Sequence, residues 1–138
     1  MRAAYMPRRQ ISQFGEKNAG KIPHHYVKVN GIEFDSQSEA DRYMELLVLQ
    51  KAGKISDLVC QPQWELIPAA SVPADITRGR AEHFRKHVYT ADFAYKDEKG
   101  NYIVEDVKSK RTREERDYRI NRKLMWMLHG IYVVEELR

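Results

Sequence analysis

The sequence predicts an α/β protein with a mixed central β-sheet flanked by two helices. Segments of alternating apolar and polar residues recur along the chain, and two amphipathic segments with helical spacing lie among them. The predicted order is hairpin, helix, strand, strand, strand, helix, strand. Because the second helix lies between two strands, we expect one right-handed crossover connection and therefore a mixed sheet.

The N-terminal part is predicted to be a flexible arm followed by a hairpin. Residues 1–24 have no sustained period and carry Gly, Pro and basic residues. Asn30 and Gly31 then separate two alternating segments, and this pair tolerates the positive φ angles of a two-residue hairpin turn. We therefore expect a basic arm over residues 1–24 and a single domain over residues 25–138.

The first helix is predicted from its caps and its periodicity. Ser36 and Glu39 form a capping box, and Gly53 is a typical C-terminal stop. One apolar stripe should pack on the sheet, and the opposite side should face solvent. The stripe comprises Ala40, Tyr43, Met44, Leu47 and Val48, and the solvent side comprises Asp41, Arg42 and Glu45.

Three further strands are expected in the middle of the chain. Residues 58–67 alternate, and Pro62 among them predicts an edge strand that is bulged or broken at the proline. Residues 68–87 are polar and contain Pro and Gly, which predicts a long loop, either a functional insertion or a partly disordered lid. Residues 88–95 and 101–108 then read as two strands joined by a short turn.

The second helix is predicted to begin at a capping box and to precede the last strand. Thr112 and Glu115 form the box, and Gly130 ends the helix. The residues expected on its apolar side are Ile120, Leu124, Met127 and Leu128. Trp64 and Trp126 are both expected in the core. Residues 131–137 complete the fold as a buried strand.

The turn after the strand at 88–95 sets the register of the central hairpin. In KDEKGN, Asp97 suits the first position of a type I turn, and Gly100 suits the left-handed position that follows it. This describes a three-residue loop with a glycine bulge, in which Asp97 pairs with Asn101.

In that register, two acids and a lysine share one face of the sheet. Asp92 lies directly opposite Asp106, and Lys108 follows Asp106 on the same side. A four-residue loop would instead pair Asp92 with Glu105.

Two ionised carboxylates at this distance repel each other, and a divalent cation would compensate. Mg²⁺ prefers hard oxygen ligands and activates water, and Lys108 is placed to position that water. Glu39 is a candidate third acid, although its capping role alone would explain its presence.

Composition and charge limit the class of protein. The chain has 138 residues and one Cys, which excludes a disulfide framework and a zinc site built from cysteines. No apolar run reaches membrane-spanning length, and the first residues lack the hydrophobic core of a signal peptide. We therefore expect a soluble protein of a reducing, cytoplasmic compartment.

Basic residues gather in patches on a chain whose net charge is only +4. Residues 78–86 hold four bases and one acid, and residues 106–123 hold eight bases and four acids. Such patches suit a polyanion such as nucleic acid, and a solvated charged surface is the other interpretation.

Four segments in this order resemble the PD-(D/E)XK nuclease superfamily, and more closely its small phage and prophage proteins. They are VNGIEFDSQSEADRY, LLVLQKAGKISDLVCQPQWEL, YTADFAY and VEDVK, and together they cover about residues 26–134. The core of that superfamily pairs an acid on an early helix with D…(D/E)-x-K on a hairpin. One departure is that Ala91, rather than the proline of the motif, precedes Asp92.

The resemblance implies a restriction-endonuclease-like core and a site for Mg²⁺ or Mn²⁺. Asp92 and Asp106 would be metal ligands, Lys108 would act on the attacking water, and Glu39 would be a further ligand or a neighbouring acid. Glu105 is the alternative ligand if the register is shifted.

The implied function is that of a metal-dependent DNA endonuclease. A structure-selective enzyme acting on branched DNA, such as a homodimeric Holliday junction resolvase of phage recombination or replication, is expected in the cytoplasm of a bacterial host. The alternatives are a nucleic-acid-binding module that does not cut, and a nuclease acting on RNA or single-stranded DNA. Candidate DNA-binding residues are Arg78, Arg80, Arg85, Lys86, Lys110, Arg111, Arg113, Arg116 and Arg119. Weaker candidates, for which an exposed position is the simpler explanation, are Gln61, Gln63, His83 and His87.

Overall fold

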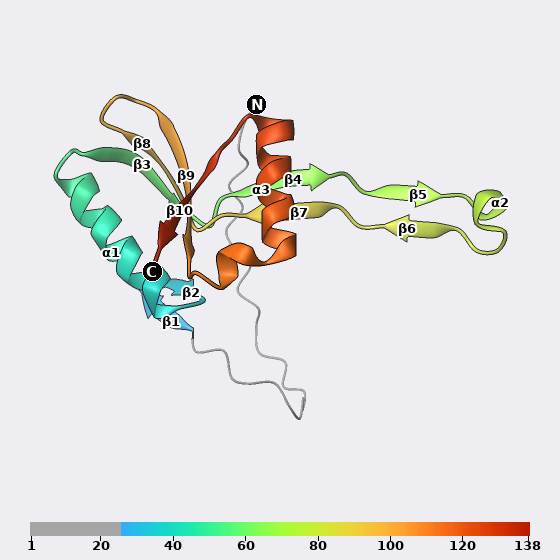
Figure 1. Cartoon of the computed structure of the whole chain (residues 1–138), viewed down its shortest axis with the longest axis horizontal. Helices are drawn as coiled ribbons and strands as arrows, with labels where there is room; N and C mark the ends of the chain where they lie inside the picture. Colours follow the sequence, from blue (N-terminus) through green and yellow to red (C-terminus); the bar gives the residue numbers. More distant parts are fainter. Residues whose placement is uncertain (1–25) are drawn as a thin grey trace.

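A mixed four-stranded sheet forms the centre of the protein in the computed structural model, which describes residues 26–138 (Figure 1). The predicted flexible arm at 1–24 lies outside the described residues. In spatial order the strands are β10 (Val133–Leu137), β9 (Tyr102–Lys108), β8 (Phe93–Asp97) and β3 (Ile55–Cys60). β10 runs parallel to β9, whereas β8 is antiparallel to both of its neighbours. The predicted α/β class with a mixed sheet is confirmed.

The N-terminal hairpin and the first helix form where they were expected. β1 (Val27–Val29) pairs with β2 (Ile32–Phe34), and Asn30 and Gly31 both have positive φ angles in the turn between them. α1 spans Gln37–Lys51, and the Ser36 hydroxyl accepts the Glu39 N–H as its N-cap.

The buried side of α1 differs from the predicted stripe. Ala40, Tyr43 and Leu46 are buried, whereas Met44 and Val48 are exposed, so the prediction was wrong for the last two. The helix is turned so that the Tyr43 ring packs against Phe34. This rotation also brings Arg42, which was expected in solvent, against the sheet, where it meets a buried acid.

The strand predicted at 58–67 is broken at the proline. β3 ends at Cys60, Gln61 takes a positive φ angle, and β4 (Gln63–Ile67) begins after Pro62 in a different sheet.

The strand predicted at 88–95 is also two strands, β7 (His87–Thr90) and β8, which separate at Ala91 and Asp92. The two breaks lie together, because the Ala91 N–H donates to the Pro62 carbonyl at 3.1 Å and the Gln61 N–H donates to the Asp92 carbonyl at 2.8 Å.

Residues 68–87 are an ordered ribbon, and the prediction of a long loop was wrong. β5 (Ala70–Val72) pairs with β6 (Glu82–Phe84), and the short helix α2 (Ala74–Thr77) lies between them. The ladder pairs backbone groups that a loop would leave to solvent. The β5–β6 ribbon extends the β4–β7 pair and projects away from the rest of the protein (Figure 1).

The second long helix starts later than predicted. Thr112–Glu114 form a separate 3₁₀ turn, η1, and α3 spans Arg116–His129 without a side-chain cap at Glu115. The Thr112 hydroxyl instead accepts the Ser109 N–H, so no capping box forms here.

The buried side of α3 also differs from the predicted side. Tyr118 and Met125 are buried, and Leu124 packs partly against the core, as predicted. Three residues expected in the core are exposed, namely Ile120, Met127 and Leu128. Trp64 is buried as expected, whereas Trp126 is exposed, because its side of α3 faces away from the sheet. Only Val133 of the last strand is fully buried, since β10 is an edge.

Two apolar clusters cover the two faces of the sheet. Phe93 and Tyr95 pack with α1 and the N-terminal hairpin, whereas Ala94 and Val104 pack with α3, β4 and β7. Because successive strand residues alternate, Asp106 belongs to the α3 face and Glu105 to the α1 face. Within residues 26–138, no helix has the length and apolar character needed to cross a membrane.

Candidate functional site

The central hairpin has the predicted register. The Asp97 N–H donates to the Asn101 carbonyl at 3.0 Å, and Gly100 has a φ of +81°. The ladder pairs Phe93 with Glu105, so its continuation places Asp92 opposite Asp106. The three-residue loop is therefore confirmed.

The two aspartates are positioned by hydrogen bonds to the opposite backbone. The Asp92 N–H donates to Oδ1 of Asp106 at 2.9 Å, and the Val107 N–H donates to Oδ2 of Asp92 at 2.7 Å. Asp92 lies at the break between β7 and β8, where its N–H is free of the regular ladder. The break in the strand thus gives the two carboxylates defined positions.

A cavity of about 320 Å³ opens in front of these acids. Glu39, Asp92, Asp106 and Lys108, the four residues predicted from sequence, all line it. The other residues lining it are Asp35, Val88, Tyr89, Thr90, Tyr118 and Asn121. The fold therefore brings together side chains from α1, β9 and the β7–β8 break.

Lys108 lies between an acid and an aromatic ring. Its Nζ is 3.9 Å from Oδ2 of Asp106 and 4.3 Å from the centroid of the Tyr118 ring. The first distance is an ion pair but is too long for a direct hydrogen bond. The ammonium donors therefore stay available to another acceptor in the cavity.

Two tyrosines complete this environment and were missed in the sequence. The Tyr89 hydroxyl donates to Oδ2 of Asp106, and burial together with the Asp106 charge raises the pKa of Tyr89. The Tyr118 ring supports Lys108. No sequence pattern could have found them, because nothing local in the sequence reports the partner of a hydroxyl.

Burial shapes the titration of the acids. Desolvation raises the pKa of Asp92 well above its usual value, and the charges of Asp106 and Glu39 raise it further. Desolvation also raises the pKa of Asp106, although the Tyr89 hydrogen bond and Lys108 oppose this change. A cation bound between the carboxylates would favour their ionised forms.

Glu39 lines the cavity and also stabilises the start of α1. Its Oε2 accepts the Asp35 N–H at 3.1 Å, and its Oε1 accepts the Ser36 hydroxyl at 3.2 Å. Burial raises the pKa of Glu39. Its role in capping α1 and its role as a third acid of the cavity therefore both have a structural basis.

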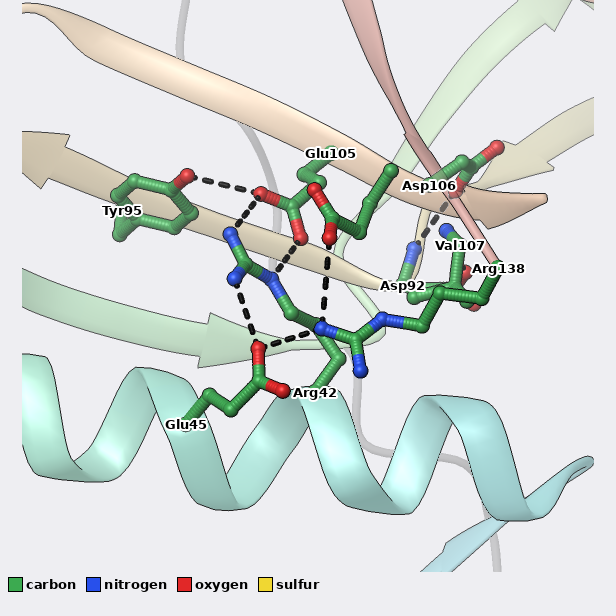
Figure 2. A network of polar contacts seen from close by, with 9 residues as sticks. Arg42, Glu45, Asp92, Tyr95, Glu105, Asp106, Val107 and Arg138 are labelled. Atoms are coloured by element: carbon green, nitrogen blue, oxygen red, sulfur yellow. Dashed lines mark hydrogen bonds and ion pairs between the residues drawn. The ribbon is translucent and has the colours of Figure 1, made fainter.

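Glu105 does not line the cavity. It lies in a polar network between β9 and α1 (Figure 2). Only 2% of Glu105 is exposed, and its two oxygens accept Arg42 Nε at 2.6 Å and Arg42 Nη2 at 2.9 Å. The Tyr95 hydroxyl adds a hydrogen bond of 2.8 Å. Because the register is not shifted, Asp106 rather than Glu105 is the acid beside Lys108.

The candidate DNA-binding residues lie outside the acidic cavity. Arg78, Arg80, Arg85 and Lys86 are exposed on and beside the β5–β6 ribbon, and none forms an ion pair with the described residues. Lys110, Arg111 and Arg116 are exposed after β9. Arg113 pairs with Glu135 at 2.9 Å and Arg119 with Glu114 at 3.9 Å.

The weaker polar candidates have partners within the protein. Gln61 Nε2 donates to the Glu33 carbonyl at 2.9 Å, and His87 Nε2 lies 2.7 Å from Asn121 Oδ1. His83 contacts the Ser71 hydroxyl at 2.7 Å. Gln63 pairs with Thr90 in the β4–β7 ladder.

The donor set fits a metal held by few protein ligands. Over residues 26–138, no group of three or more His, Cys, Asp or Glu side chains is arranged to hold a metal ion. Mg²⁺, however, usually takes one or two protein carboxylates and completes its octahedron with water and substrate phosphate. Asp92 and Asp106 supply two carboxylates in a desolvated cavity that opens to solvent.

The chain belongs to the family described as "Protein of unknown function (DUF1064)", which matches residues 19–133. Neither the curated proteins nor the solved structures gave a match.

Proposed function

We propose that this member of the DUF1064 family is a metal-dependent DNA endonuclease with a restriction-endonuclease-like core. The observation that supports this function most directly is the convergence of Asp92, Asp106 and Lys108 in one polar cavity at a break in the sheet. Asp106 lies on β9 and Asp92 lies opposite it at the break between β7 and β8, and the lysine lies two residues beyond Asp106. Acids that can hold a metal ion, together with a cation that can stabilise charge on a phosphoryl oxygen, suit hydrolysis of a phosphodiester bond.

The acids would hold the metal, and the chain would supply the remaining groups. Asp92 and Asp106 would bind Mg²⁺ or Mn²⁺, which when bound supplies Lewis-acid stabilisation of the phosphate and lowers the pKa of water. The backbone N–H groups of Asp92 and Val107 fix one oxygen of each carboxylate, and Tyr89 orients Asp106. These bonds limit the reorganisation needed when the site fills.

Lys108 would position the attacking water and balance charge on the phosphate. Its ammonium is held near Asp106 and the Tyr118 ring without a direct hydrogen bond to the acid. It therefore keeps donors for the water or for a phosphoryl oxygen. Glu39, at the cavity wall, would add a ligand or a hydrogen-bond acceptor for water.

The β5–β6 ribbon would bind the DNA backbone. It carries cations that form no ion pair with the described residues, and it projects away from the rest of the protein (Figure 1). Contacts of this kind give affinity that falls with salt and carries no base sequence. Together with the resemblance to phage proteins, this favours a structure-selective enzyme for branched DNA, such as a homodimeric junction resolvase in a bacterial host cytoplasm.

A nucleic-acid-binding module that does not cut is the second candidate. The observation that favours it is that each aspartate already accepts a backbone hydrogen bond, so both acids have a structural role without a metal. Both candidates bind DNA, and only the nuclease turns it over when metal is supplied.

A cleavage assay separates the candidates. Labelled four-way junction, duplex DNA, single-stranded DNA and RNA are incubated with Mg²⁺, Mn²⁺ or EDTA. The wild type should cut only with metal and should prefer the junction. Asp92→Asn, Asp106→Asn and Lys108→Ala should bind DNA, but their cleavage rates should fall by about 100-fold or by a larger factor. Lys51→Ala, which removes an exposed lysine at the end of α1, is the matched control and should cut normally.

Cleavage that does not respond to metal, or active-site variants that cut like the wild type, would favour the binding module. Preferential cleavage of RNA or single-stranded DNA would support nuclease activity but would contradict branched DNA as the substrate.

A further inference from the structure

A second hollow, larger than the acidic cavity, lies between α3, η1 and β10. Its volume is about 830 Å³, and it shares no lining residue with the acidic cavity. The residues lining it are Arg113, Glu114, Arg119, Arg122, Lys123, Trp126, Met127, Tyr132 and Glu135. We call this hollow the α3 groove.

Large apolar side chains are unusually exposed in the α3 groove. The exposed fractions are 58% for Trp126, 63% for Tyr132 and 77% for Met127. A cluster of this kind on a soluble surface marks a place where a partner binds. The two rings offer flat apolar faces rather than a deep apolar pocket.

The cations of the α3 groove are partly held in place. The Glu135 side chain is 8% exposed and pairs with Arg113 at 2.9 Å and with Arg122 at 2.8 Å. The Arg122 guanidinium also lies 4.6 Å from the centroid of the Tyr132 ring. Four cations and two acids line the groove, so its net charge is positive.

Charge and aromatic faces together identify the occupant. Single-stranded nucleic acid is bound by stacking its bases on aromatic side chains beside cations that hold its phosphates. Duplex bases are stacked internally and do not reach such a platform. A second copy of the chain on a two-fold axis would place the same positive surface against itself, which like charges oppose.

We propose that the α3 groove binds an unpaired nucleotide, with its base stacked on Trp126 and its phosphates near Arg119 and Lys123. This inference rests on the proposed function and deepens it, because it names branched DNA that carries an unpaired nucleotide beside the branch point as the substrate class. α3 separates the groove from the acidic cavity, since Tyr118 and Asn121 line the cavity while Arg119 and Arg122 line the groove. One strand passing around α3 would meet both.

Tryptophan fluorescence tests this proposal without cleavage. The chain has two tryptophans, and of these Trp64 is buried, so quenching by added nucleic acid reports Trp126. Asp106→Asn protein in EDTA is titrated with oligo(dT), with duplex DNA of equal length and with a forked duplex. We expect quenching by oligo(dT) and by the fork, and none by the duplex. Trp126→Phe should abolish the quenching and keep most of the affinity.

Affinity of the variants gives the second readout. Trp126→Ala should weaken oligo(dT) binding about tenfold or more and leave duplex binding unchanged. Ile120→Ala, an exposed apolar residue of α3 outside the groove, is the matched control and should bind like the parent.

Several results of these experiments would contradict the proposal. Absence of quenching by oligo(dT), equal quenching by duplex, or normal binding by Trp126→Ala would overturn the proposal. A blue shift of Trp126 emission that grows with protein concentration alone would also overturn it, because a second copy would then cover the groove. If oligo(dT) quenches Trp126 but the wild-type protein cuts no DNA, the nuclease proposal would be rejected and the proposal of a nucleotide-binding groove would stand.

Discussion

Asp92 and Asp106 hold each other in register across two strands, because the Asp92 N–H donates to Oδ1 of Asp106 at 2.9 Å. Asp92 also accepts the Val107 N–H, so each acid is anchored to the strand of the other. The break after β7 makes this possible, since it frees the Asp92 N–H from the ladder. The result is a preformed pair of carboxylates with little freedom to move apart.

Mg²⁺ should stabilise the folded protein if this pair binds it. A ligand that binds only the native state adds about 2.7 kcal/mol at 100 times its Kd. We expect the melting temperature of the wild type to rise with Mg²⁺ in calorimetry and that of Asp106→Asn to stay constant. Asp57→Asn, an exposed acid on β3, is the control and should respond like the wild type. An equal rise in Asp106→Asn would place the metal elsewhere.

Stability in EDTA should fall as pH rises through the weakly acidic range. Burial raises the pKa of Asp92 and of Asp106, so the folded state binds more protons than the unfolded state above the ordinary carboxyl pKa. The free energy of unfolding therefore decreases from that value up to the raised pKa values.

The Asp92→Asn variant checks the sign of this effect. It removes one buried ionisable group, so it should be more stable than the wild type at pH 7, and the difference should shrink toward pH 4. Urea titrations at a series of pH values measure it. A variant less stable than wild type at neutral pH would show that ionisation of Asp92 is favourable in the fold.

Arg42→Ala should destabilise the protein strongly. Glu105 is buried, both of its oxygens accept hydrogen bonds from Arg42, and Arg42 is the cation that balances its charge (Figure 2). Removing one member of a buried pair leaves an uncompensated charge and costs about 3 kcal/mol or more. Arg42→Met combined with Glu105→Leu should recover most of the loss, and exposed Glu45→Ala should change little. Urea unfolding of these variants measures the difference, and a loss below 1 kcal/mol for Arg42→Ala would contradict the structural role of the pair.

Neutralising the β5–β6 ribbon should weaken DNA binding and its dependence on salt. The plot of log K against log salt has a negative slope, and each lost phosphate contact makes this slope shallower by about 0.9 for duplex DNA. The variant replaces Arg78, Arg80, Arg85 and Lys86 with Gln. The charge-matched control replaces Lys51, Lys54, Lys96 and Lys99, which lie at the end of α1 and near the β8–β9 turn. Equal slopes for the two variants would show that only net charge matters.

Local signals predicted the geometry of the acidic cavity well. The residues from Asp97 to Gly100 are typical of one turn type, and this turn sets the register of the central hairpin. The pairing of Asp92 with Asp106 could therefore be predicted from sequence. Pro62 likewise marked the break after β3. No residue marked the matching break at Ala91, because it follows from the neighbouring strands and not from local preference.

Features that depend on residues distant in the sequence could not be predicted from local patterns. α3 carries apolar residues on several sides, so periodicity could not say that Met125 would be buried and Trp126 exposed. Arg42 reads as a surface residue until Glu105, 63 positions away, is placed beneath it. The β5–β6 ribbon was hidden because its strands have three residues each and are supported mainly by each other.

The most direct test compares two neighbouring acids in one cleavage assay with Mg²⁺ and a labelled four-way junction. Asp106→Asn alters the face with Lys108, and Glu105→Gln alters the face with Arg42. We expect Asp106→Asn to fold and bind the junction without cutting it, and Glu105→Gln to be less stable but to cut at nearly the wild-type rate in its folded fraction. Cleavage by Asp106→Asn at the wild-type rate would contradict a catalytic site in this cavity.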